Sequence, residues 1–313
     1  MIVERHDGTE YRSAQRCVQG EARLEVVGLE SAAMDQEFHE IAPLSSEAVR
    51  DARPVESATV LPPVFPDVAM SRRAAINDII ILLGFMLCFA LISLFAGISE
   101  RLQERWPEGG RFLWVPMNGV FCLAVVTWLV RRRGQGAAAI GLGRARVGRV
   151  LLIALAAVPL CYLAGVISNA MFIAASGKGF IGFARERGQF IDVVAEIPLG
   201  WVVPLSIFAG IYEDIVFRGF LISRLQALSR SRAVPVVVSS LIFGGLHFTQ
   251  GLPGMCQTAL VGMVLAMVAV RARSIWPCML AHAAVDTISL LVAVLVNPKL
   301  QEVLRQLTTQ SAD

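Results

Sequence analysis

The sequence of 313 residues predicts an all-α, polytopic transmembrane helical bundle of about seven to eight spans. The chain is 55% hydrophobic and 17% charged, with a mean hydropathy of +0.62. A soluble domain has about a quarter of its residues charged. Several uncharged stretches reach the roughly 20 residues that a helix needs to cross a bilayer. The alternating segments that would build a membrane β-barrel are not visible in the sequence.

Charge divides the chain into an acidic beginning and a basic remainder. Residues 1–70 contain six arginines and thirteen acidic residues, a net charge of −7, and the rest carries +10. We expect residues 1–70 to be a polar, disordered cytoplasmic segment, with an extended linker over Pro54–Pro66. A small partner-binding module is the alternative. The arginines elsewhere border apolar stretches rather than form a stripe, so we expect no nucleic-acid partner.

Residues 71–149 are expected to form two transmembrane helices and a basic loop. The first span is predicted over Ile79–Ile98. The second covers Phe112–Val130, with Trp114 and Trp128 as interfacial anchors, and three arginines end it.

Residues 150–297 are predicted to contain the functional core. The charges of Gly177–Glu196 alternate with aromatic residues, which predicts an interfacial amphipathic segment. It would be a surface connector, a lid over the site, or an eighth span if it dips into the membrane. Residues 249–257 are expected to be a loop and 298–313 a short polar tail. The five spans expected here are Val150–Ser176, Ile197–Ser223, Ala233–Phe248, Thr258–Val270 and Ser274–Asn297.

Basic clusters stand at alternate junctions of these seven spans. Positive residues favour the cytoplasmic side of a membrane. The pattern therefore places the N-terminus in the cytoplasm and the C-terminus outside. We expect an integral protein of the bacterial inner (plasma) membrane.

Three charges interrupt the fourth span, and they are the starting point for a site. A charged residue at membrane depth costs roughly 2.5–3.5 kcal/mol, so such residues are rare and usually functional. Asp214 and Arg218 are four residues apart, which places them on one helix face where they can pair. Glu213 is rotated by about 100° and can face the centre of the bundle.

Two later spans add histidines and a third carboxylate. His282 and Asp286 are four residues apart, so the carboxylate can orient the imidazole. His247 follows Gly244-Gly245, and glycines let helices approach closely in lipid. Such a group of acids, histidines and one arginine is compatible with catalysis, ion transport or metal binding.

The pattern Glu213-Asp214-x-x-x-Arg218, Phe243-x-x-x-His247 and His282-x-x-x-Asp286 resembles the three motifs of the CAAX-protease and bacteriocin-processing (CPBP, also called Abi) intramembrane proteases. In that family the motifs read EExxxR, FxxxH and HxxxN/D, in this order. The resemblance covers roughly residues 150–297. Asp214 departs from the family pattern, because it is one methylene shorter than the second Glu.

The resemblance implies an intramembrane endopeptidase. Glu213 and His247 would activate a water, and His282, oriented by Asp286, would stabilise the oxyanion. Arg218 would hold Asp214. The substrate would be a peptide bond near the membrane surface of a membrane-anchored or lipidated (CAAX-like or sorting-signal) protein.

The cofactor and the function class have alternatives. Glu213, His247 and His282 could supply three ligands to Zn²⁺, as in a metalloendopeptidase, although the metal-free mechanism is the one we favour. Buried acids and histidines also serve as proton relays, so an ion-coupled transporter is a second reading. A non-catalytic membrane immunity or scaffold protein is a third.

Overall fold

The structure is a computed structural model that describes residues 2–6, 9–13, 64–65, 70–107, 110–177, 179–229 and 231–310. The chain forms two compact units, Met1–Ser57 and Ala58–Asp313. In the first unit, β1 (Ile2–His6) pairs with β2 (Thr9–Ser13) in an antiparallel hairpin. This hairpin differs from the disordered segment expected for residues 1–70. The remainder of that prediction, apart from residues 64–65 and 70, lies outside the described residues.

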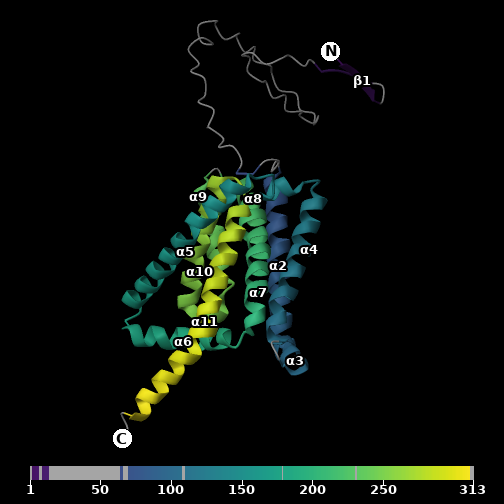
Figure 1. Cartoon of the computed structure of the whole chain (residues 1–313). Helices are drawn as coiled ribbons and strands as arrows, with labels where there is room; N and C mark the ends of the chain where they lie inside the picture. Colours follow the sequence, from purple (N-terminus) through teal and green to yellow (C-terminus); the bar gives the residue numbers. More distant parts are fainter. Residues whose placement is uncertain are drawn as a thin grey trace, which may run out of the picture. The chain divides into compact units, whose positions relative to one another are not determined.

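The second unit is a helical bundle, and the predicted fold class is confirmed (Figure 1). Among the described residues, six helices are long and apolar enough to cross a membrane, and a seventh apolar helix is shorter. The six are α2 (Arg72–Ala96), α4 (Trp114–Arg132), α5 (Val147–Ser176), the continuous α7–η3–α8 segment (Leu199–Glu213, Asp214–Leu221 and Ile222–Leu228), α10 (Gly251–Ala272) and α11 (Trp276–Gln310). The short one is α9 (Ala233–Gly245).

Shorter helices connect the spans. The predicted amphipathic segment is helical as α6 (Gly179–Ala195), which runs across one end of the bundle in Figure 1. Its placement there fits an interfacial helix better than an eighth span. The other connectors are α3 (Ile98–Arg105), η1 (Gly110–Leu113), η2 (Ala137–Ile140) and η4 (Phe248–Gln250).

Two helices extend into stretches that the sequence predicted to be a loop and a tail. Most of the expected loop 249–257 is the first two turns of α10, which accommodate Pro253 because the first turn of a helix has no amide partner to lose. Helix α11 continues past Pro298 to Gln310 through the expected polar tail. That tail contains three Leu and three Gln, which are good helix formers.

A buried polar cluster ties the start of α2 to the ends of α4 and α8. Asp78 and Arg224 are fully buried, and Arg224 Nε donates to Asp78 Oδ2 at 3.2 Å. Arg133 donates Nη2 to Asp78 Oδ1 at 2.6 Å, and this hydrogen bond raises the pKa of Arg133. Arg224 also donates to Gln135 at 2.8 Å. The cluster fixes how α8 is rotated against α2.

The last residues of the expected linker belong to the core of the second unit. Val64 donates its amide to Gln226 Oε1 at 2.8 Å, and its carbonyl accepts from Arg273 Nε at 3.2 Å. The Phe65 side chain is fully buried, and its ring lies against Gly141. The linker prediction for Pro54–Pro66 is therefore wrong at Val64 and Phe65. The hydrogen bonds of Val64 and the burial of Phe65 attach both residues to the bundle.

Candidate active site

The first motif lies where the fourth predicted span changes its hydrogen-bond register. Glu213 ends α7, and Asp214 begins η3, a π-helical stretch that ends at Leu221. π-Helical turns are rare and frequently stand at functional sites. Ser239 of α9 donates its hydroxyl to the Phe217 carbonyl at 2.8 Å, so a neighbouring helix also bonds to this stretch.

Asp214 and Arg218 form a buried ion pair within this stretch. Arg218 Nη1 lies 3.0 Å from Asp214 Oδ1, and the two side chains are 1% and 0% exposed. The contact lacks the alignment of a hydrogen bond, since both oxygens of Asp214 and both terminal nitrogens of Arg218 are buried without a hydrogen-bond partner. The guanidinium carbon lies 4.0 Å from the centre of the Phe243 ring. The pairing expected from the four-residue spacing is therefore present.

Glu213 has a hydrogen-bond partner of its own outside that pair. Tyr212 donates its hydroxyl to Glu213 Oε1 at 2.8 Å, and Glu213 is only 9% exposed. The sequence reasoning gave Tyr212 no role, although a phenol beside a membrane carboxylate was a usable signal. Tyr212 packs against Gly119 of α4, where an added Cβ would lie 2.7 Å from the ring. Helix α4, outside the motif region, thus supports the carboxylate.

His282 of α11 stands among three carboxylates. Its Nε2 lies 3.7 Å from Glu213 Oε2 and 3.5 Å from Asp286 Oδ2, and its Nδ1 lies 3.5 Å from Asp214 Oδ1. The imidazole thereby joins both acids of the first motif to the acid of the third. Asp286 is the most accessible of the three, with a side chain 33% exposed. The cluster is therefore least enclosed by protein on the side of Asp286.

Two glycines bring the motif helices this close. A Cβ on Gly210 would lie 2.9 Å from the Ala283 amide nitrogen and 3.0 Å from the Met279 carbonyl oxygen, so α7 touches the backbone of α11. A Cβ on Gly244 would lie 2.6 Å from the Met255 carbonyl, so α9 touches α10 in the same way. The expectation that Gly244 permits close helix packing is confirmed.

Phe243 connects the three motifs through its ring. Besides Arg218, it contacts His247 with ring centres 4.6 Å apart and His282 with centres 6.0 Å apart, both edge to face. His247 lies just beyond α9, and its Nδ1 is 2.7 Å from the Phe243 carbonyl oxygen. The phenylalanine of the second motif is therefore a packing centre for the site, a role the sequence reasoning did not assign.

The expected zinc ligands are not gathered around one point. Among the described residues, no group of three or more His, Cys, Asp or Glu side chains is arranged to hold a metal ion. The zinc set of Glu213, His247 and His282 stays a prediction that metal analysis has to test.

Helix α6 contributes a cation near the end of the bundle. Arg187 donates Nη2 to Gln257 of α10 at 2.9 Å, and burial lowers the pKa of Arg187. Its Nη1 is buried without a hydrogen-bond partner. The bond ties α6 to α10, which is consistent with either a connector or a lid.

Comparison with known proteins identifies the same region. Residues 195–288 match the family described as "Type II CAAX prenyl endopeptidase Rce1-like". No curated protein and no solved structure matches the chain. The match covers less than a third of the sequence and holds all seven residues of the three motifs. The chain is thus a helical integral membrane protein whose residues 195–288 are similar to Rce1-like type II CAAX prenyl endopeptidases.

Proposed function

We propose that this protein hydrolyses a peptide bond close to the membrane surface, using a water activated by Glu213 and His247. The observation that carries the proposal is the buried cluster in which His282 lies within 3.7 Å of Glu213 and within 3.5 Å of Asp286. Glu213 is a buried carboxylate that can accept a proton, and the His282 imidazole beside it can donate a hydrogen bond. The cluster is exposed on one side, so both groups can reach one substrate carbonyl.

The first step is the attack of water. Tyr212 occupies Glu213 Oε1, which leaves Oε2 to accept a proton from water. With the Nδ1 proton of His247 donated to the Phe243 carbonyl, Nε2 keeps its lone pair and can accept the other water hydrogen. The water oxygen bonds to the carbonyl carbon as Glu213 takes the proton.

The second step is the collapse of the tetrahedral intermediate. His282 donates Nε2–H to the oxyanion in place of Asp286, whose Oδ2 lies 3.5 Å from that nitrogen, while Asp214, 3.5 Å from Nδ1, keeps the ring in this orientation. Glu213 then returns its proton to the leaving amine as the C–N bond breaks. Asp214 and Arg218 hold η3 in place without touching the substrate.

The substrate we propose is a membrane-anchored or lipidated protein, cut near its C-terminus. The matching family is described as a CAAX prenyl endopeptidase, which supports a substrate of this class. The exposed edge at Asp286 gives such a chain a route to the cluster.

The membrane orientation belongs to the same proposal. The arginine clusters support an N-terminus in the cytoplasm and a location in the bacterial inner membrane. A reporter fused after Arg133 or Arg232 should be cytoplasmic, and one fused after Gly251 should lie on the opposite side. Inverted signals at all three positions would reverse the proposed orientation.

The proposed base is tested with Glu213→Gln. The variant should stay folded and lose cleavage of a lipidated, membrane-anchored reporter by about 10²-fold or more, because a general base contributes at least this much. Glu100→Gln, which removes an exposed carboxylate of α3, is the matched control and should cleave normally. Near-normal turnover by purified Glu213→Gln protein in liposomes would refute the mechanism.

Two measurements on the same liposomes address the alternatives. Metal analysis of the active protein decides whether zinc accompanies it, and loss of activity on chelation with recovery on zinc addition would support the zinc set. Proton-coupled solute flux without cleavage would favour the transporter.

A further inference from the structure

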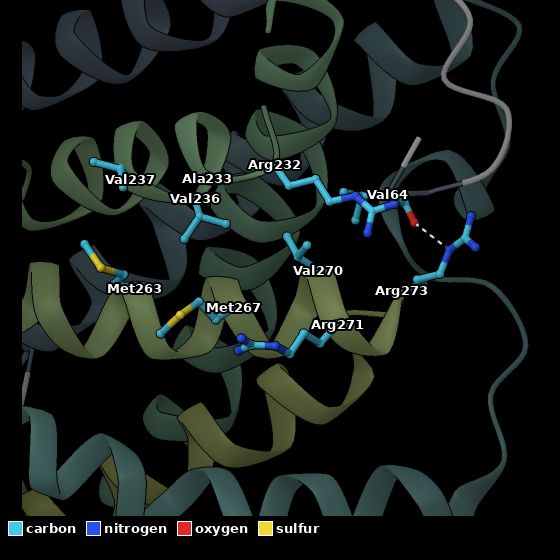
Figure 2. Close-up of a pocket in the computed structure, with 10 residues that line it drawn as sticks. All are labelled: Val64, Arg232, Ala233, Val236, Val237, Met263, Met267, Val270, Arg271 and Arg273. Carbon is cyan, nitrogen blue, oxygen red and sulfur yellow. Dashed lines mark hydrogen bonds between the residues drawn. The ribbon is translucent and has the colours of Figure 1, made fainter. Parts of the chain in front are cut away.

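A second cavity lies at the basic end of α9 and α10, away from the candidate active site. It has a volume of about 580 Å³, and none of the seven motif residues lines it (Figure 2). Ten residues line it: Val64, Arg232, Ala233, Val236, Val237, Met263, Met267, Val270, Arg271 and Arg273. This volume is in the range of small-molecule sites, which is roughly 300–1,000 Å³.

The lining has two chemically distinct zones. Three arginines stand at the rim, where α9 begins and α10 ends, and none of the described lining residues is acidic. The remaining lining residues are all apolar, with two methionines among them. In Figure 2, Arg271 extends along α10 toward Met267, and Arg232 extends toward Val64. A ligand that fits must therefore combine an anionic end with an apolar body.

The rim is positioned by the folded segment before α2. Arg273 donates Nε to the Val64 carbonyl at 3.2 Å, shown as the dashed line in Figure 2. Val64 is itself buried and hydrogen-bonded to Gln226. The hydrogen bond to the buried Val64 thus fixes the position of Arg273 at the rim.

The apolar zone opens toward the lipid. Val237 and Met267 are 38% and 36% exposed on the outside of two helices whose neighbouring surfaces are apolar. In a bilayer these side chains lie beside acyl chains, and the arginines lie at head-group level, since basic residues gather at the ends of spans. Basic pockets between transmembrane helices suit anionic head groups.

We propose that this cavity binds an anionic phospholipid. Its phosphate is held by Arg232, Arg271 and Arg273, and one acyl chain lies in the groove between α9 and α10. Charge complementarity selects anionic over zwitterionic lipids, and the groove selects a lipid over a soluble phosphate. The proposal does not depend on proteolysis, because binding alone tests it.

The test is lipid binding by the delipidated full-length protein, measured by native mass spectrometry. Phosphatidylglycerol should bind at least about tenfold more tightly than phosphatidylcholine with the same acyl chains. The triple variant Arg232→Gln, Arg271→Gln, Arg273→Gln should lose this preference, since each arginine near the head groups contributes about fivefold. The control triple Arg131→Gln, Arg146→Gln, Arg149→Gln removes the same charge from exposed arginines outside the cavity and should keep the preference.

Two further variants guard against a folding defect. The pair Arg232→Gln, Arg271→Gln retains the bond between Arg273 and Val64 and should still weaken binding. Met267→Trp fills the groove without changing charge and should lower the affinity for lipid. The proposal would be overturned if the two lipids bound with equal affinity, or if both triple variants lost the lipid preference equally. Displacement of the lipid by inorganic phosphate at matched concentration would also overturn it.

Discussion

Asp214 and Arg218 differ in how many partners each would keep if the other were removed. Asp214 touches both Arg218 at 3.0 Å and His282 at 3.5 Å. Among the described residues, Asp214 is the carboxylate recorded beside Arg218, whose other contact is the face of Phe243. The aspartate therefore retains an electrostatic partner when the arginine is lost, whereas the arginine does not retain one when the aspartate is lost.

This asymmetry predicts unequal single-variant effects. Removing one member of a buried pair costs roughly 3–5 kcal/mol, because the other charge is left uncompensated. Asp214→Ala should reach that range, and Arg218→Ala should cost less because His282 remains. The double variant should be less destabilised than the sum of the two. A double-mutant cycle on unfolding in detergent measures the coupling, and strict additivity would show that the two side chains do not stabilise each other.

The sequence was more informative about charged groups than about the aromatic ring between them. Spacing alone paired Asp214 with Arg218, because four residues complete about one helical turn. The contacts of Phe243 with Arg218, His247 and His282 depend on three helices meeting, which no spacing within one segment reveals. Tyr212 was missed for the same reason, because its hydrogen bond to Glu213 depends on the orientation of the Glu213 side chain.

At the scale of the helices, the approach of α7 to α11 sets the distance between Glu213 and His282. Gly210 lies one turn before Glu213, and a Cβ there meets the backbone of Ala283 and Met279 at 2.9–3.0 Å. Backbone atoms cannot move aside as a flexible side chain can, so the helices themselves have to separate.

Gly210→Ala should therefore impair catalysis through helix spacing. We expect a destabilisation of about 1–3 kcal/mol, typical of overpacking, and a fall in kcat of at least about tenfold as the 3.7 Å gap to His282 widens. The control is Gly200→Ala in the same helix, where an added Cβ meets nothing within 4 Å. That change should be neutral or stabilising, because Ala favours helix. Equal activity of the two variants would contradict this account.

The element boundaries show what periodicity and composition can and cannot locate. Apolar runs bounded by arginines predicted α4 and α5 to within three residues at each end. They failed at α10, whose first turns are uncharged but contain Gly251 and Pro253, residues typical of loops. The π-helical stretch η3 leaves no mark in hydropathy, since a change of hydrogen-bond register does not alter composition.

For the whole molecule, the boundary between the N-terminal unit and the helical bundle falls earlier than the residue 70 that the acidic composition indicated. Residues 1–57 form a unit of their own, whereas Val64 and Phe65 are buried in the bundle. Composition could not separate these two parts. Both lie in the polar, proline-containing sequence that precedes the first apolar helix.

Deletion of residues 2–57 should therefore leave activity and thermal stability unchanged. Deletion of residues 2–66 should lower stability, because it removes Phe65 and both backbone bonds of Val64. Phe65→Ala in the full chain should cost roughly 3–5 kcal/mol, as for other buried phenylalanines. Thermal unfolding in detergent and reporter cleavage measure both effects. Inactivity of a well-inserted protein lacking residues 2–57 would show that the first unit takes part in the reaction.

The π turn limits how the chain can tolerate insertions and deletions. A π-helical turn contains one more residue between its hydrogen-bonded groups than an α-helical turn. The stretch Asp214–Leu221 therefore acts as a one-residue insertion in the helix Leu199–Leu228. On one side, Gly210 fixes the helix against α11, and on the other, Arg224 fixes it against Asp78. Deleting one residue between them would rotate one half against the other by about 100°. Either Glu213 or Arg224 would then leave its partner, so the length of this segment is as constrained as its residues.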